Sequence, residues 1–165
     1  MSKRMNTGEG DPTVPGPSQR LNAQVAGVDY GVLDELVGYA LRRAQIRIYQ
    51  DFLETMAAWS ITPPRFSAMT LLDANAGMKL TELANAMGIA RSGAVQVVHA
   101  LEKLGHVKRT DSAVDRRAHS LALTASGTAA LRSIRRAIKQ HDERISTRLS
   151  EDEKKELRRL LDLLG

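Results

Sequence analysis

The sequence predicts a mainly α-helical fold with a small β wing, and three observations lead to this prediction. Two runs of apolar residues at helical spacing lie between residues 80 and 104, separated by Gly88. The stretches HVKRT and HSLAL follow Gly105 and can pair as a hairpin. Longer helical patterns precede and follow this block. The arrangement is that of a winged helix-turn-helix held between N-terminal and C-terminal helices.

Residues 1–28 are predicted to form a disordered N-terminal tail, because they contain three of the five prolines and few large apolar side chains. A long helical pattern without proline then runs from Tyr30 to about Trp59. Its apolar residues lie on more than one side, which predicts burial against its own domain and against a second subunit. The alternative is the central core helix of a monomer.

Two further helices are predicted before the glycine turn. Thr62 followed by Pro63 has the pattern of an N-cap and a first helical residue, and this helix should end near Ala74. A shorter helix follows over residues 80–87, with Thr81 as its expected N-cap. The glycine after it can take the left-handed conformation that ends one helix and starts the turn to the next.

The second helix of the motif is amphipathic. Its predicted buried stripe consists of Ala94, Val97, Val98, Leu101 and Leu104. Polar and basic residues lie at its start and along the opposite face: Arg91, Ser92, Gln96, His99 and Lys103. Because the DNA major groove admits a helix whose first residues reach base edges, we expect Ser92 to contact bases, Gln96 to pair with adenine and Arg91 with guanine or phosphate. His99 and Lys103 are expected to meet phosphate or water.

The predicted hairpin has a charged tip. In its second strand, Leu121 and Leu123 alternate with Ser120 and Ala122, which is the period of a half-buried strand. The loop between the strands contains Asp111, Ser112, Asp115, Arg116 and Arg117. Arginines at such a tip suit the minor groove, whose narrow A·T-rich parts have an enhanced negative potential.

Two helices are predicted after the hairpin. Thr124 is the expected cap of a long helix that reaches about Leu149. Ser150 and Glu153 have the spacing of a capping box, which starts the last helix. One stripe of that helix consists of Leu157, Leu160, Leu161 and Leu164. Such a stripe at the end of the chain favours a dimer.

Composition restricts the possible functions. The formal net charge is +5, and basic residues concentrate on the predicted reader helix and wing, which favours nucleic acid as the partner. There is no cysteine, so a disulfide framework and a thiol redox switch are excluded. No apolar run is long enough to cross a membrane, and the N-terminus lacks the apolar region of an export signal. We therefore expect a cytoplasmic protein without a membrane partner.

The stretches LTELANAMGIARSGAVQVVHALEKLGHVKR and DRRAHSLALTASG resemble the MarR family of transcriptional regulators. The family's wing signature, an Asp and an Arg two apart, matches Asp115 and Arg117, and implies that Arg117, with Arg116 beside it, enters the minor groove. The resemblance implies a MarR-type domain over 29–165, in which a reader at 62–123 contains the winged helix-turn-helix at 80–123. Dimerisation helices at 30–59 and 124–164 would join those of an identical subunit. A homodimer on double-stranded DNA predicts a near-palindromic operator with half-sites about 34 Å apart or a multiple of it.

The resemblance further implies a repressor that a small effector releases. Tyr39, Arg43 and Arg47 follow one another at spacings of four residues, and Trp59 and Phe66 could add a flat apolar wall. An aromatic carboxylate or its coenzyme A thioester suits this set, because a cation can pair with the anion while the rings stack. The alternative is that the arginines form surface ion pairs and that the two aromatic residues belong to the core.

Other classes of site are not predicted. The histidines His99, His106, His119 and His141 lack the spacing of a zinc site, and His141 beside Asp142 and Glu143 is expected on a solvated helix face. No nucleotide-binding, hydrolase or metalloprotease motif occurs, so we expect neither a catalytic residue nor a cofactor. The remaining alternative is a winged-helix module for protein contacts, or an architectural DNA-binding module without effector. Against protein contacts, Gln96 and the basic wing are expected to be exposed, whereas a protein-binding face more often shows apolar or aromatic anchors.

Overall fold

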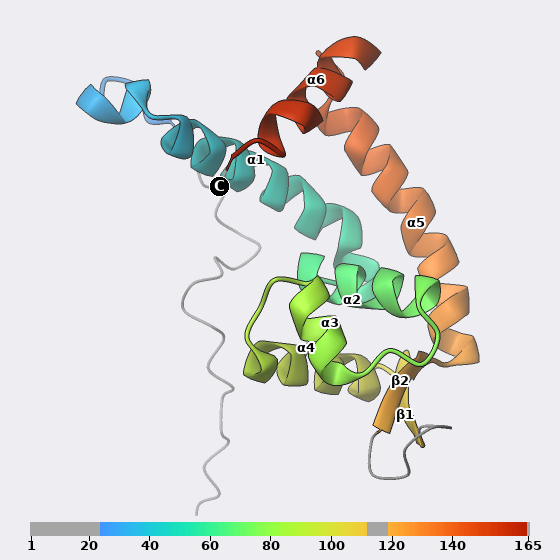
Figure 1. Ribbon diagram of the computed structural model, residues 1–165. Helices are drawn as coiled ribbons and strands as arrows, with labels where there is room; N and C mark the ends of the chain where they lie inside the picture. The colour runs from blue at the N-terminus through green and yellow to red at the C-terminus, as the bar shows by residue number, and fades with distance from the viewer. Residues whose placement is uncertain (1–23, 112–118, 165) are drawn as a thin grey trace, which may run out of the picture. The chain divides into compact units, whose positions relative to one another are not determined.

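The computed structural model describes residues 24–111 and 119–164 (Figure 1). Most of the predicted N-terminal tail and most of the predicted wing loop, including Arg116 and Arg117, lie outside these residues. By its internal contacts the chain divides into a first unit that ends at Gln50 and a second unit that begins at Asp51. Helix α1 (Val37–Met56) contributes residues to both units.

The prediction of one continuous helix from Tyr30 to Trp59 is wrong. A short 3-10 helix, η1 (Gly31–Glu35), precedes α1, and Leu36 between them has an extended backbone. A second 3-10 helix, η2 (Ala57–Trp59), follows α1. Before η1, the Asp29 carboxylate accepts a hydrogen bond from the Gly31 amide at 2.8 Å, which forms a local turn.

None of the described residues up to Gln50 is buried. Large apolar side chains there are exposed, namely Val25, Val28, Val32, Leu33, Leu36, Val37, Leu41 and Ile48. Burial against the chain's own core is therefore confirmed only for the C-terminal part of α1, where Phe52 and Met56 are buried. The exposed remainder is the type of surface that a second subunit covers.

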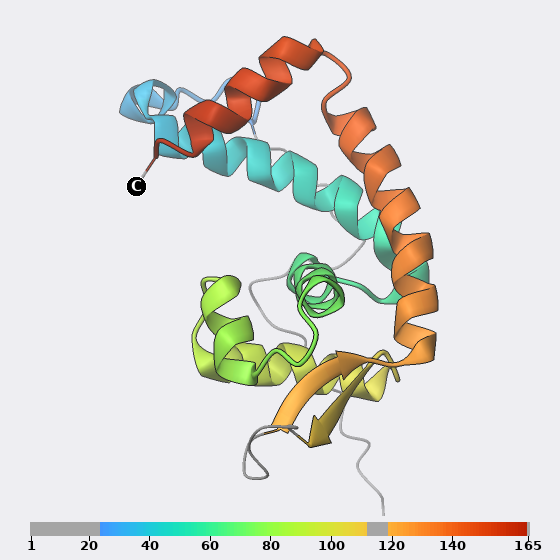
Figure 2. The ribbon, with the colours of Figure 1, turned by 45° about the vertical axis from the view of Figure 1, so that its right-hand side comes forward.

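The core of the second unit is built around α2 (Pro63–Ala74). This helix contacts α3 (Leu80–Ala86), α4 (Arg91–Lys103) and α5 (Ala125–Ile145), as Figure 2 shows. The largest fully buried side chains come from α1 and from all four of these helices: Met56, Met69, Leu83, Val98, Leu101, Leu131 and Ile134. The start of α2 after Thr62 and its end at Ala74 are as predicted. The second unit thus has one continuous apolar core.

The predicted hairpin is confirmed. Strands β1 (Val107–Asp111) and β2 (His119–Leu123) pair antiparallel and form the sheet of the described chain. The strict alternation predicted for β2 is wrong at Ser120, which is buried. Its hydroxyl lies 2.8 Å from the hydroxyl of Thr110, and its backbone forms a β-bridge with Lys79. A polar side chain is tolerated in this position because it has a hydrogen-bond partner.

Two predicted helix starts are confirmed by their caps. At the start of α5, the Thr124 hydroxyl accepts a hydrogen bond from the amide three residues later at 2.9 Å. At the start of α6 (Glu151–Leu161), the Ser150 amide donates to the Glu153 carboxylate at 2.8 Å, and the Ser150 hydroxyl accepts from the Glu153 amide. Both patterns are local in the chain, and the residues that make them are therefore visible in the sequence.

Two other predicted helix ends are wrong. Thr81 lies inside α3, and Lys79 is the N-cap, with its amide donating to the Glu82 carboxylate at 2.7 Å. The β-bridge between Lys79 and Ser120 fixes the backbone of Lys79. The helix therefore starts earlier in the chain than the predicted N-cap, Thr81. Helix α5 ends at Ile145, before the predicted Leu149, because the chain turns there toward the capping box of α6.

His141 is 5% exposed, so the prediction that it lies on a solvated helix face is wrong. Its Nδ1 donates to the Asp51 carboxylate at 2.5 Å, and its ring is edge-on to Phe52. Arg144 donates to the same carboxylate at 3.0 Å and to the Thr55 hydroxyl at 2.6 Å. Burial raises the pKa of Asp51, but the hydrogen bonds from His141 and Arg144 outweigh it and hold that pKa below its usual value. The cluster fixes α5 to the last turns of α1.

Replacing His141 with alanine is expected to lower the free energy of unfolding by about 2 kcal/mol. The variant loses a charge-assisted hydrogen bond and the contact with Phe52, although Asp51 is 34% exposed and water can replace part of the bond. Chemical denaturation followed by circular dichroism measures the change. The matched control is His99→Ala, since His99 is exposed on α4 and its loss should leave stability within about 0.5 kcal/mol. Equal stabilities of the two variants would contradict the assignment.

Candidate nucleic-acid interface

Helix α4 is held in place by its apolar side. Ala94, Val98 and Leu101 are fully buried, and Val97 and Leu104 are half-buried, which confirms the predicted stripe. The turn into α4 also matches the prediction, since Gly88 has a φ of +64°. Any other residue there would adopt this left-handed conformation at a cost. The fold therefore presents one face of α4 in a fixed orientation relative to α3.

The residues predicted to contact DNA lie together on the other side of α4. The five side chains are exposed: Arg91, Ser92, Gln96, His99 and Lys103. Within the described part of the chain, none of the five forms a hydrogen bond or an ion pair with another side chain. A row of polar groups without protein partners is available to bind base edges and phosphates. Val95, which the sequence pattern does not single out, is exposed among them.

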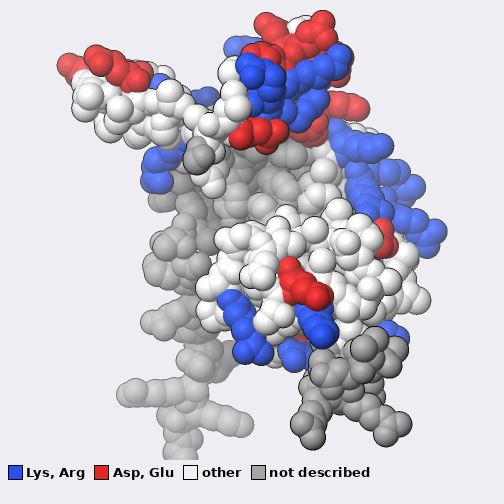
Figure 3. Space-filling view, viewed as in Figure 1, with Lys and Arg blue, Asp and Glu red and all other residues white. Residues whose placement is uncertain are grey.

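The surface around this face is basic in spots rather than continuously. Figure 3 shows Lys and Arg side chains separated by uncharged surface and by an acidic patch in the lower part of the molecule, where α4 lies. A longer basic run follows α5 on the right of the same view, and its residues are Arg132, Arg135, Arg136 and Lys139. Of these, Arg135 pairs with Asp73 at 2.8 Å. The α5 run is thus a second source of positive potential beside the reader.

An ion pair connects the described part of the wing to helix α4. Arg109 on β1 pairs with Glu102 on α4 at 3.0 Å, while Lys108 beside it is exposed. The predicted minor-groove residues Arg116 and Arg117 lie outside the described residues. The strands that lead to them are defined, so the position from which the loop leaves the domain is set by β1 and β2.

The joint between wing and α5 depends on Gly127, a role that the sequence pattern does not predict. Gly127 is buried in the first turn of α5, and a Cβ built there would overlap the backbone carbonyl of His106. Thr124 holds the same junction, with its hydroxyl donating to the Gly105 carbonyl at 2.6 Å and its amide to the His106 carbonyl at 3.0 Å. Only glycine allows this close approach of two backbones. The sequence signal is a glycine in the first turn of a helix, where glycine is otherwise unfavourable.

The predicted effector residues fall into two groups. In the first unit, the Arg43 guanidinium lies 5.2 Å from the ring centroid of Tyr39 and pairs with Asp34 at 2.6 Å. Arg47, one turn further along, is exposed. In the second unit, Trp59 and Phe66 are half-buried and pack against the core. The structure therefore brings Tyr39 and Arg43 together, with the guanidinium already stacked on a ring and paired with a carboxylate.

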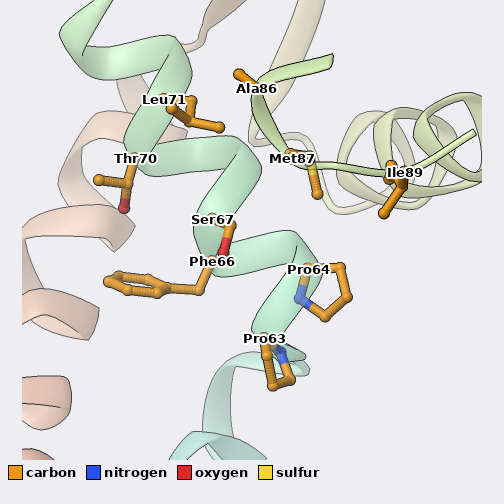
Figure 4. A pocket seen from close by; sticks show the side chains of 9 residues that line it. All are labelled: Pro63, Pro64, Phe66, Ser67, Thr70, Leu71, Ala86, Met87 and Ile89. Atoms are coloured by element: carbon orange, nitrogen blue, oxygen red, sulfur yellow. The ribbon is translucent and has the colours of Figure 1, made fainter. Parts of the chain in front are cut away.

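An apolar hollow of about 550 Å³ lies between α2 and the turn that follows α3. Figure 4 shows the side chains that line it, which are Pro63, Pro64, Phe66, Ser67, Thr70, Leu71, Ala86, Met87 and Ile89. Phe66 is one of the predicted effector residues. The hydroxyl oxygen of Thr70 is buried and has no hydrogen-bond partner within the described structure. The hollow adjoins the turn that sets the direction of α4, but its lining contains no charged side chain.

The described residues contain neither a group of candidate metal ligands nor a helix that could span a membrane. Among them, no three His, Cys, Asp or Glu side chains lie close enough to share a metal ion. Within the same residues, each helix is too short or too polar to span a lipid bilayer.

The comparisons with known proteins agree with this geometry. The model of the MarR family matches residues 61–119 of the chain. The chain is 34% identical over 144 residues to a transcriptional regulatory protein assigned to the hcr operon of Thauera aromatica, and the match covers 87% of each of the two chains.

Solved structures with the same fold include complexes with DNA and with small molecules. The repressor CouR bound to a 23-mer DNA duplex has a TM-score of 0.78 and 40% identity, over 83% of this chain and 97% of CouR. CouR bound to p-coumaroyl-CoA has a TM-score of 0.76 and 40% identity, over 82% and 95% of the chains. The Mycobacterium tuberculosis protein Rv2887, solved with salicylic acid, has a TM-score of 0.62 and 26% identity, over 79% and 96%.

Proposed function

The chain belongs to the MarR family of transcriptional regulators, and we propose that it is a homodimeric repressor that an aromatic carboxylate, or its coenzyme A thioester, releases from its operator. The observation that supports this most directly is the exposed polar face of α4, which has no protein partner within the described residues and is held rigidly by the core. A rigid helix that presents unpaired polar side chains near its N-terminus suits the major groove.

The proposed roles follow from position along α4 and the wing. Arg91, Ser92 and Gln96 lie in the first half of α4 and would read base edges, while His99 and Lys103 would contact phosphate. Arg116 and Arg117 would enter the minor groove from the wing, as the family resemblance implies. Phosphate contacts would supply most of the affinity, and the base contacts the sequence preference.

The proposed dimer explains the exposed apolar residues at both ends of the chain. The α6 side chains Leu157, Leu160 and Leu161 are exposed, as are those of the first unit. Helices within residues 30–59 and 124–164 would bury these side chains against an identical subunit. Two readers related by a twofold axis would then bind a near-palindromic site.

The proposed effector class is supported by relatives and by one local arrangement. CouR has been solved with p-coumaroyl-CoA and Rv2887 with salicylic acid, and both ligands combine an aromatic ring with an anionic group. In this chain, Tyr39 and Arg43 place a ring and a cation in contact, with Arg47 exposed nearby on the same helix. These residues, with Trp59 and Phe66, are the proposed effector contacts. A ligand anion would compete with Asp34 for Arg43.

The test is binding of the purified full-length protein to the DNA upstream of its own gene and neighbouring genes, over a series of salt concentrations. A repressor of this type should bind one near-palindrome with a strong salt dependence. Adding aromatic acids and their coenzyme A thioesters should abolish that binding for one compound class. Weak, sequence-independent binding would instead favour an architectural protein, and no binding at low salt would favour a protein-interaction module.

Replacing Gln96 with alanine is expected to relax the preference at one base pair and to cost about 1–3 kcal/mol against the preferred site. The reason is that a glutamine amide can donate to and accept from adenine at the same time. A selection from randomised duplexes measures the preference at each position. Gln140→Ala, on the exposed surface of α5, is the matched control. An unchanged preference at all positions would remove Gln96 from the readout.

We propose no enzymatic activity and no cofactor, because the polar side chains of the candidate interface are arranged for binding and the relatives are transcriptional regulators. The proposed location is the cytoplasm, where the DNA of a bacterial operon is found.

A further inference from the structure

Val95 lies on the side of α4 that faces away from the core. The core side of this helix is filled by Ala94, Val98 and Leu101, each fully buried, whereas Val95 is 40% exposed. The structure describes all of α4, and Val95 is the one large apolar side chain of this helix that is exposed. A β-branched residue also loses rotamer freedom in a helix, so neither helix propensity nor packing accounts for a valine here.

The neighbours of Val95 are the residues proposed to contact DNA. Arg91 precedes it by four residues, Ser92 precedes it by three, and His99 follows it by four. Residues three and four apart are adjacent on a helix surface. Val95 therefore lies inside the proposed reading face, in the first half of α4, which is the part that reaches base edges in the major groove.

The major-groove edges of the four bases contain one methyl group, the C5-methyl of thymine. A valine side chain has no donor or acceptor, so it satisfies none of the hydrogen-bonding groups on the other base edges. Contact with a thymine methyl removes apolar surface of both partners from water. We propose that Val95 is a specificity-determining residue that recognises the methyl group of one thymine in each half-site. This inference rests on the proposed function and adds a base preference that Gln96 and Arg91 do not supply.

The test removes the methyl group from the DNA rather than only the side chain from the protein. A preferred site is first obtained with the full-length wild-type protein from randomised duplexes. Each thymine that the selection requires is then replaced by deoxyuridine, which differs from thymidine only by that methyl. Binding of the wild type, Val95→Ala and Val95→Thr to every duplex is measured by fluorescence anisotropy. Because Val95 is exposed, the variants should fold as the wild type does, which circular dichroism checks.

At one thymine per half-site, deoxyuridine should weaken wild-type binding by about fourfold, which is the loss expected for one buried methyl group. Val95→Ala should bind the thymine and deoxyuridine duplexes equally at that position and should respond as the wild type does at all others. Val95→Thr, which keeps a methyl group on Cβ, should retain part of the discrimination.

Two results would overturn the proposal and are distinguishable from failure of the repressor function. If a preferred site exists but the wild type tolerates deoxyuridine everywhere, Val95 reads no methyl group. The same conclusion follows if Val95→Ala keeps the full deoxyuridine penalty. If the selection enriches no site at all, both the DNA-reading function and the role of Val95 are wrong.

Discussion

Replacement of Gly127 with alanine is expected to lower the free energy of unfolding by about 3 kcal/mol or more. The new Cβ would overlap the carbonyl of His106, and this obstacle is backbone that cannot rotate away. Relief requires α5 to move away from β1, which breaks the hydrogen bonds of Thr124 to that junction. Urea denaturation of the purified variant gives the change in stability. Because the same junction positions the wing, operator affinity should fall as well.

Gly93→Ala is the matched control for Gly127→Ala. Gly93 is also in a helix, but a Cβ there would meet only the Ile89 side chain at 3.6 Å, which is ordinary contact. Alanine has the better helix propensity, so this variant should be as stable as the wild type or more stable by up to about 1 kcal/mol. If Gly127→Ala unfolds at the same urea concentration as Gly93→Ala, the close approach of Gly127 to His106 is wrong.

Replacing Leu160 and Leu161 with glutamate is expected to produce a monomer whose operator affinity is lower by about a hundredfold or more. The two leucines are exposed on α6 in the single chain, and the proposed dimer buries them. A carboxylate in an apolar interface is not solvated and has no partner, so the interface should not form. A monomer binds one half-site and loses the advantage of two linked contacts. Analytical ultracentrifugation measures the mass, and a gel-shift titration the affinity.

Lys155→Glu provides the control for added negative charge on the same helix. Lys155 is exposed and forms an ion pair with Asp152 in the neighbouring turn, and it lies on the side of α6 away from the leucine stripe. This variant should remain dimeric and should bind the operator with nearly wild-type affinity. Should the double leucine variant also remain a dimer, the exposed stripe of α6 is not part of the interface.

The elements that were predictable are those whose signals are local. The proline at the start of α2, the capping box of Ser150 and Glu153, and the Thr124 cap involve residues at most three or four positions apart. The apolar stripe of α4 repeats with the helical period, so its opposite face, and with it the candidate reading residues, follows from the spacing of apolar residues alone. Local geometry determines these features.

The features that were not predictable depend on residues far apart in the chain. The partner of His141 is 90 positions away, and without Asp51 in view a histidine beside two acidic residues indicates a solvated face. Lys79 became the N-cap of α3 because the sheet holds its backbone. The predicted stripe of α4 already excludes Val95, but a valine has no polar group that marks it as a reading residue, and only the structure shows that it is exposed among those residues.

The sequence by itself determined the fold class, the order of the elements and the polar face of α4, because helical and strand periods and caps follow from neighbouring residues. Tertiary structure decided which side chains of that face have no protein partner among the described residues, that Gly127 must be glycine, and that Asp51 and His141 join α1 to α5. The physical reason is that burial and close backbone approach arise only when distant segments pack together. A residue's chemistry therefore does not reveal its role until its neighbours in space are known.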